Sequence, residues 1–335
     1  MTSIDQRLRE ALSQVIYPDF SLDLLSMGVV KEASLQEGLA RIILRPIAAP
    51  QEKLDLLKSQ IEKTLLTLGQ VERVSIEWPT ANRPPNQPVR IDRVGKTIAV
   101  GSCKGGVGKS TLTVNLARCL QAMGKNAGLL DLDIYGPSLP AILNIKQARV
   151  NADSEGRIIP LVLPDGLKAL SIGFMTAPEQ ALVWRGPMLI KLVRQLLHKT
   201  AWHGLDFLLL DLPPGTGDVQ MSLLRHIILD GVIIVSTPQE AALDDTVRGI
   251  NMFQRSQVPI IGLVENMSYF ICPSCQSAHY IFGRDTVEPL ARRMNLNFLG
   301  QIPLNPALQQ LDRQAKDYAE ITKPYDELAR KLLTV

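Results

Sequence analysis

A glycine-rich stretch at residues 101–111, GSCKGGVGKST, constrains the fold of this chain more than any other part of its sequence. The apolar run just before it, residues 97–100, has the character of a β-strand, and apolar residues recur at helical spacing after it. Strand, glycine-rich turn and helix in this order are the context that a phosphate-binding loop requires. The sequence therefore predicts an anion site where this strand meets this helix.

The residue types in this loop suit a nucleoside triphosphate. Its glycines can adopt positive φ angles and bring backbone N–H groups close to an anion. Lys109 would neutralise the β- and γ-phosphates, and the Ser110 hydroxyl would ligate Mg²⁺. We expect the nucleotide to contact Lys104, Gly105, Gly106, Val107, Gly108, Lys109, Ser110 and Thr111.

The loop departs from the pattern G-x-x-x-x-G-K-[ST] at one position, because Cys103 stands where the first glycine would fall. An additional lysine, Lys104, follows it. The string KGGVGKST resembles the P-loop of the dimeric ATPase superfamily that includes the MinD/ParA, ArsA and nitrogenase iron proteins. That resemblance implies that Lys104 reaches across a subunit interface to the partner's nucleotide and acts in catalysis with Lys109.

Three carboxylates follow apolar strands downstream of the loop. Asp131 and Asp133 end one such run, and alternation along an extended segment would direct both to the same side. Asp211 ends the run FLLLD and precedes PPGTGD, the arrangement in which a carboxylate holds Mg²⁺ through water. Resemblance to the superfamily assigns Asp133 the orientation of the attacking water. It also implies that Asn266 and Pro303 bracket adenine, and ATP fits better than GTP because the chain lacks an N-K-x-D guanine motif.

A C-x-x-C pair, Cys272 and Cys275, lies in one connection between a strand and a helix. Two thiolates at this spacing can hold one metal, but zinc and iron–sulfur clusters generally take four ligands. His279 could supply a third ligand, and two copies of the pair around a dimer axis would supply four sulfurs. A bridging cluster, a bridging zinc ion and a redox-active or inert pair all remain open from the residues alone.

The motifs KGGVGKST, DLDIYGPSLP, VWRGPM, LLDLPPGTGD and ENMSYFICPSC occur in this order and resemble those of the Mrp/ApbC family of iron–sulfur cluster carrier ATPases. The resemblance implies ATP hydrolysis with Mg²⁺, and a [4Fe–4S] cluster that Cys272 and Cys275 of two subunits bridge. It also implies a homodimer that receives clusters from assembly scaffold proteins and passes them to apo-proteins. Two alternatives are a MinD/ParA-like ATPase that acts in positioning on membrane or DNA, and a zinc-bridged dimeric ATPase switch.

The hydrophobic pattern predicts three segments. Residues 1–78 show an α-β-β-α-β order and resemble the small α+β domain of iron–sulfur assembly factors. Residues 79–93 contain four prolines and indicate a linker. Residues 94–335 alternate near-continuous apolar strands with helical patterns, which indicates an α/β fold with a mostly parallel, doubly wound P-loop NTPase sheet. Strands are expected at 97–101, 127–131, 167–172, 207–211, 232–236, 260–264 and 298–302.

Composition excludes several other functions. The net charge of +3 is too small to indicate nucleic-acid binding. The N-terminus MTSIDQRLRE has no apolar core of a signal peptide, and we find no apolar stretch of membrane-spanning length. Four cysteines are too few for a disulfide framework in 335 residues. We therefore expect a cytoplasmic protein that acts on neither nucleic acid nor membrane.

Overall fold

A computed structural model describes residues 4–16, 23–26, 29–44, 51–77, 88, 90–134, 136–154, 156–175, 186–310 and 318–334. The chain divides into two compact units, Met1–Gln87 and Pro88–Val335, each with its own hydrophobic core. The predicted linker lies mostly outside the described residues, as do the first three residues of VWRGPM. Among the helices of the described residues, none is both long and apolar enough to span a membrane.

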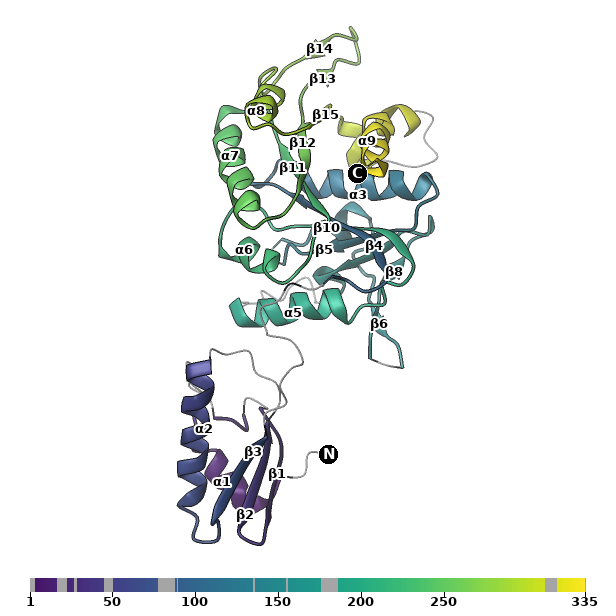
Figure 1. Cartoon of the computed structure of the whole chain (residues 1–335). Helices are drawn as coiled ribbons and strands as arrows, with labels where there is room; N and C mark the ends of the chain where they lie inside the picture. Colours follow the sequence, from purple (N-terminus) through teal and green to yellow (C-terminus); the bar gives the residue numbers. More distant parts are fainter. Residues whose placement is uncertain are drawn as a thin grey trace. The chain divides into compact units, whose positions relative to one another are not determined.

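The N-terminal unit is a three-stranded sheet packed against two helices (Figure 1). A two-residue turn with positive φ at Glu37 and Gly38 joins the first two strands as an antiparallel hairpin, and the third strand pairs parallel to the second. The helices bury leucine and isoleucine side chains at helical spacing against the sheet. The element order is the predicted one: α1 (Gln6–Leu12), β1 (Val30–Gln36), β2 (Leu39–Leu44), α2 (Gln51–Leu66) and β3 (Arg73–Glu77).

The C-terminal unit is built on an eight-stranded sheet with the order β15-β12-β11-β4-β10-β5-β9-β8. All neighbouring strands are parallel except β8, which pairs antiparallel to β9 at one edge. The mostly parallel sheet predicted from the sequence is therefore confirmed. Its strands are β4 (Val94–Gly101), β5 (Ala127–Asp131), β8 (Leu161–Val162), β9 (Lys168–Ser171), β10 (Leu205–Asp211), β11 (Gly231–Ser236), β12 (Ile260–Asn266) and β15 (Phe298–Ile302).

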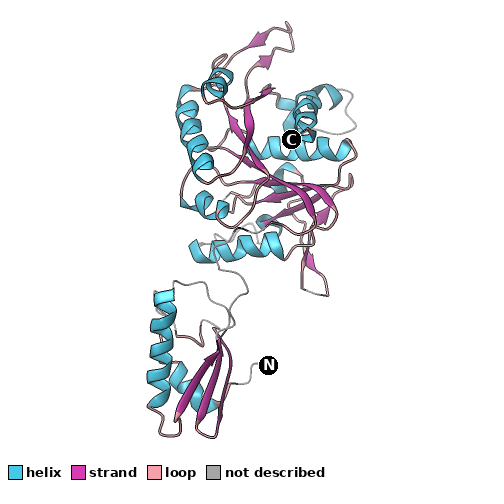
Figure 2. Ribbon diagram, viewed as in Figure 1, coloured by secondary structure: helices cyan, strands magenta, loops and turns pink. Residues whose placement is uncertain are grey.

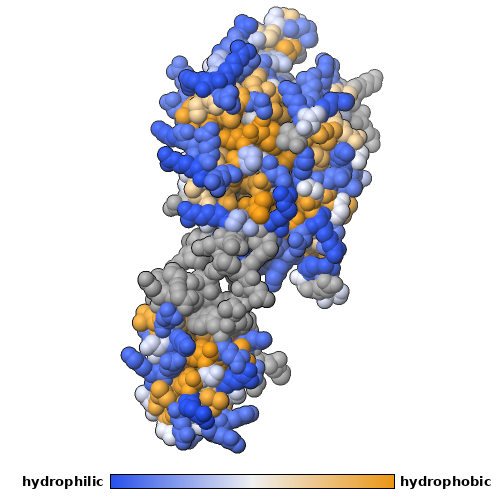
Figure 3. Space-filling view, viewed as in Figure 1, coloured by the Kyte–Doolittle hydropathy of each residue, from blue (hydrophilic) through white to orange (hydrophobic). Residues whose placement is uncertain are grey.

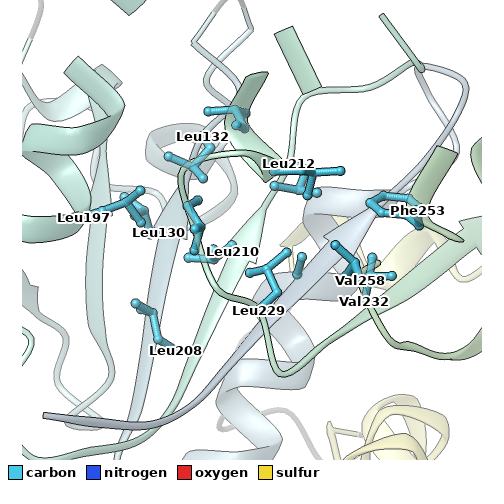
Figure 4. Packing of buried hydrophobic residues seen from close by; sticks show 14 of the residues in the cluster. Leu130, Leu132, Leu197, Leu208, Leu210, Leu212, Leu229, Val232, Phe253 and Val258 are labelled. Carbon is cyan, nitrogen blue, oxygen red and sulfur yellow. The ribbon is translucent and has the colours of Figure 1, made fainter. Parts of the chain in front are cut away.

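Helices cover both faces of this sheet (Figure 2). Successive strand residues point to opposite faces: Leu130, Leu208 and Leu210 join one buried cluster, shown in Figure 4, while Leu129 and Leu209 join the other. This double burial explains the near-continuous apolar runs in the sequence. One face carries α5 (Gly186–His198), α6 (Asp218–Leu224), α7 (Glu240–Arg255) and α8 (Val287–Arg293); the other carries α3 (Lys109–Ala122), α4 (Leu139–Ile142) and α9 (Tyr318–Leu333).

Two small hairpins lie outside the main sheet. One pairs β6 (Asn151–Ala152) with β7 (Ile158–Ile159), and the other pairs β13 (Phe270–Ile271) with β14 (Ala278–His279). Strands of two residues are too short to show periodicity, so the sequence did not predict them. The second hairpin extends past the ends of β12 and β15 and carries the C-x-x-C pair (Figure 1).

Candidate functional site

The glycine-rich loop joins β4 to α3 at the carboxyl end of the sheet. Gly106 and Gly108 have positive φ angles of 78° and 81°, whereas Gly105 does not have a positive φ. Gly108 is the N-cap of α3, and residues 104–106 are exposed. The first helical turn therefore begins at this loop, and its free backbone N–H groups fit the anion site that the sequence predicts there.

Asn266, at the end of β12, holds this loop in place. Its side chain is buried, and its Nδ2 donates a hydrogen bond of 2.7 Å to the carbonyl of Val107. A Cβ at position 108 would lie 2.1 Å from that nitrogen, so Gly108 is required for this close approach as well as for its positive φ. The sequence suggested an adenine contact for Asn266 and missed its contact with the phosphate loop.

The loop tolerates Cys103 at the position of the usual glycine, because its side chain packs against α7 at Gly249. A Cβ at Gly249 would lie 1.9 Å from the Cys103 sulfur, so the absence of a side chain on the helix makes room for the one on the loop. Burial raises the pKa of the Cys103 thiol to about 11. This cysteine is therefore a packed residue at the start of the loop, and its raised pKa favours the protonated thiol at neutral pH.

Lys109 and Asp211 form a buried ion pair at the base of the site. The distance from Lys109 Nζ to Asp211 Oδ1 is 2.5 Å, and the two side chains are 6% and 0% exposed. Ser110 Oγ lies 3.2 Å from the same ammonium group. The second carboxylate oxygen, Asp211 Oδ2, is buried and has no hydrogen-bond partner among the described residues. A buried carboxylate oxygen without a partner suits a Mg²⁺ ion or one of its water ligands.

Asp131 lies directly beside Asp211, because the two residues are register partners on adjacent strands. The Ser171 hydroxyl donates to Asp131 Oδ2 at 3.0 Å, and the Asp133 N–H donates to its Oδ1 at 3.0 Å. Burial, and then the charge of Asp211, raises the pKa of Asp131 to about 7. A cation bound between these carboxylates would restore the ionised form of Asp131.

Asp133 lies in the loop after β5, outside the strand. The alternation of side chains along a strand therefore does not determine its orientation relative to Asp131. Its carboxylate accepts a hydrogen bond of 3.2 Å from the N–H of Gly136, and its side chain is partly exposed.

The loop after Asp211 is tied to the phosphate loop, since the Gly215 N–H donates to the carbonyl of Ser102 at 2.9 Å. Lys104 is exposed, and Pro303 follows β15 in a partly buried position.

The hairpin β13–β14 brings Cys272, Cys275 and His279 together. Their ligand atoms all lie within 4.8 Å of one another, and Cys275 and His279 are exposed. Hydrogen bonds from the side chain and backbone of Ser277, then from His279 and Cys272, lower the pKa of the Cys275 thiol to about 6. The site therefore offers a thiolate at neutral pH, which is the form that binds metals.

These opposite pKa shifts predict a large difference in alkylation. Cys275 is expected to react with iodoacetamide at pH 7, with a rate that falls as the pH decreases through about 6. Cys103, whose pKa is raised to about 11, is expected to stay unmodified under the same conditions. Peptide mass spectrometry after a short anaerobic pulse measures both residues in one sample. Equal labelling of the two would contradict the assigned environments.

Two family models and several curated proteins match this chain. A family model described as NUBPL iron-transfer P-loop NTPase matches residues 93–334, and one described as iron-sulfur cluster assembly protein matches residues 5–78. The iron-sulfur cluster carrier protein of Aquifex aeolicus is 37% identical, and the alignment covers 98% of this chain and 96% of that protein. The one of Deinococcus radiodurans is 40% identical, with 99% and 93% covered.

Two solved structures resemble this chain. A nucleotide-binding protein from Archaeoglobus fulgidus, solved with ADP and with cobalt, is 34% identical with a TM-score of 0.59, over 72% of this chain and 90% of that one. The cell division ATPase MinD of Pyrococcus furiosus has a TM-score of 0.53 at 22% identity, over 72% and 99% of the two chains, and shows the fold alone. The resemblance inferred from the motifs is confirmed: this chain belongs to the family of NUBPL iron-transfer P-loop NTPases.

Proposed function

We propose that this protein is an ATP-dependent iron–sulfur cluster carrier that works as a homodimer. The names of its full-length relatives support the carrier activity. The observation that carries the proposal is the position of the pair Cys272 and Cys275. Cys272 follows Asn266, which bonds to the phosphate loop, by six residues. The [4Fe–4S] cluster is the cargo, and the two pairs of a dimer supply the four thiolates that it needs.

The residues at the phosphate loop fit MgATP as the substrate. Lys109 would exchange its contact with Asp211 for one with the β- and γ-phosphates. Ser110 would hold Mg²⁺ directly, and Asp211 would hold it through water. Asp131 adds negative charge beside the ion, and Asp133 orients the attacking water. Lys104, which is exposed at the mouth of the loop, reaches the nucleotide of the partner subunit. Asn266 and Pro303 remain the proposed contacts to adenine.

The path from nucleotide to cluster is short. Asn266 bonds to the Val107 carbonyl in the phosphate loop, and the chain from Asn266 reaches Cys272 in six residues. The root of the hairpin is fixed to the neighbouring strand, because the Leu304 N–H donates to Tyr269 at 2.7 Å and the Ser268 N–H donates to Ile302 at 3.1 Å. We propose that movement of the loop on ATP binding or hydrolysis is transmitted along this segment, so that the two nucleotide states hold the cluster with different affinity.

The rest of the chain serves delivery in this proposal. Residues 1–78 and 94–335 act as two domains joined by the linker 79–93, with the small domain facing other proteins of cluster assembly. Assembly scaffolds donate clusters, apo-proteins receive them, and the exchange takes place in the cytoplasm. A positioning ATPase on DNA or membrane is the weaker alternative, because it leaves the cysteine hairpin without a role.

Cluster transfer from the loaded protein to an apo-ferredoxin tests the function directly. We expect ATP to accelerate the transfer and a non-hydrolysable analogue to slow it. The absorbance and the electron spin signal of the acceptor measure the transfer. Anaerobic reconstitution of the wild-type chain should give about four iron atoms per dimer. A colourless protein with one tightly bound zinc ion per dimer would instead support the zinc-bridged switch.

Replacing Asn266 by alanine is expected to uncouple the two sites. The change removes the bond to Val107, so at saturating ATP the ratio of transfer rates with and without ATP should fall toward one. Asn297→Ala is the matched control, since its Nδ2 donates to the backbone of β12 at 3.1 Å without touching the phosphate loop. If both variants keep the wild-type ratio, the segment 266–272 does not carry the coupling.

A further inference from the structure

The hairpin β13–β14 contains a third donor besides the two cysteines. The ladder pairs Phe270 with His279 and Ile271 with Ala278, which returns the chain beside Cys272. In this arrangement one ring nitrogen of His279 lies within 4.8 Å of both sulfurs. Three donors from one chain already form the larger part of a tetrahedral metal site.

The turn that carries the cysteines is well ordered by hydrogen bonds. The Cys272 N–H donates to Ser277 at 3.0 Å, and the Gln276 N–H donates back to Cys272 at 2.8 Å. Gln276 has a positive φ of 57°, and its side-chain amide donates to Pro273 at 3.2 Å. The turn therefore holds both sulfurs close to the histidine without help from a second chain.

Aromatic contacts fix the other end of the hairpin. The rings of Tyr269 and Tyr280 lie 6.3 Å apart at its root, and the Arg284 guanidinium lies 4.6 Å from the Tyr280 ring centroid. His279 directly precedes this braced tyrosine. The metal-binding face remains open, because Cys275 and His279 are exposed, and Figure 3 shows apolar residues among hydrophilic ones at this end of the unit.

We propose that Cys272, Cys275 and His279 of a single chain bind one divalent metal ion, with the fourth position open to water or to an incoming ligand. A donor set of two thiolates and one imidazole suits a borderline-soft ion such as Zn²⁺, Co²⁺ or Fe²⁺. A metal–sulfur bond of about 2.3 Å in a tetrahedral site needs donors about 3.8 Å apart, so the three side chains close by only about 1 Å. This state holds one ion per chain, whereas a bridging cluster belongs to two chains.

The open fourth position would let this site pass its ion to another molecule, which a closed structural site with four protein ligands cannot do. Three protein ligands leave room for a donor from another molecule to attach before the ion departs. The inference concerns the same hairpin as the proposed function but does not depend on cluster binding. Metal uptake by the single chain and cluster uptake by the dimer are separate measurements.

Anaerobic titration of the full-length, nucleotide-free protein with Co²⁺ tests the site. We expect the ligand-field bands of a tetrahedral ion and a sulfur-to-cobalt charge-transfer band, both saturating at one Co²⁺ per chain. His279→Ala should weaken Co²⁺ binding more than about tenfold. Loss of a residue that only supports a metal ligand already costs about tenfold or more, and His279 is a ligand itself in this proposal. His198→Ala, at an exposed histidine on α5, is the matched control and should titrate as wild type. Cys272→Ser should lower the charge-transfer intensity per bound Co²⁺, because only the Cys275 thiolate remains.

A second measurement does not require any variant. Proton NMR of the Co²⁺-loaded wild-type protein should show one hyperfine-shifted imidazole N–H signal per chain. Saturation at one Co²⁺ per two chains, wild-type affinity in His279→Ala, or absence of the shifted signal would each overturn the inference. If the chain binds one Co²⁺ but takes up no cluster on reconstitution, the proposed carrier function fails while this site stands. If His279→Ala loses Co²⁺ but keeps the cluster, both stand.

Discussion

Lys109→Ala is expected to abolish ATP hydrolysis and to destabilise the nucleotide-free protein. Loss of the ammonium group removes the charge that faces the β- and γ-phosphates, and turnover should fall at least about 10²–10³-fold, as when a preorganised donor is removed. The same change leaves the carboxylate of Asp211 buried without its partner, which lies 2.5 Å away in the wild type. Breaking a buried ion pair on one side costs about 3–5 kcal/mol. Phosphate release and differential scanning calorimetry measure the two effects.

Lys104→Ala is the matched control, because both lysines belong to the same loop but only Lys109 is buried. Lys104 is exposed, so its loss should change the stability by less than about 0.5 kcal/mol. If Lys104 completes the site of the partner subunit, hydrolysis should still fall while ATP binding is retained. Unchanged hydrolysis in Lys109→Ala would remove the assignment as an ATPase, and an unchanged melting temperature would contradict the buried ion pair.

The Cys272→Ala/Cys275→Ala protein is expected to remain colourless after anaerobic reconstitution with iron and sulfide. The wild-type chain should absorb broadly in the visible and contain about four iron atoms per dimer, since four thiolates ligate such a cluster. The double variant removes all four thiolates from the proposed interface at once. Its fold should be unaffected, because Cys275 is exposed and the hairpin lies outside the main sheet. Iron and sulfide analysis beside the visible spectrum gives the result.

The other two cysteines provide a control with the same number of thiols removed. Cys103 packs against Gly249 and Cys119 lies in the core, so Cys103→Ala/Cys119→Ala should still take up the cluster. ATP hydrolysis by the Cys272→Ala/Cys275→Ala protein should persist, since none of its phosphate-loop residues has changed. A coloured Cys272→Ala/Cys275→Ala protein with a full complement of iron would refute the proposed cluster ligands.

Much of the architecture follows from local sequence. The alternation of apolar strands with helices predicted the parallel sheet, because strands buried on both faces need apolar residues at nearly every position. The order strand, GGVGK, helix predicted the anion site, because its backbone geometry depends on residues adjacent in the chain. The short strands β6, β7, β8, β13 and β14 escaped prediction, since two residues carry no pattern and their pairing depends on what they meet in the fold.

The sequence by itself determined which chemical groups are present and that strand ends gather them at one edge. Only the tertiary structure decided their partners. It set Lys109 against Asp211, turned Asn266 onto the phosphate loop, and gave the Cys103 side chain its space at Gly249. These contacts join residues about a hundred or more positions apart, and their distances depend on strand order and helix packing, which no local pattern encodes.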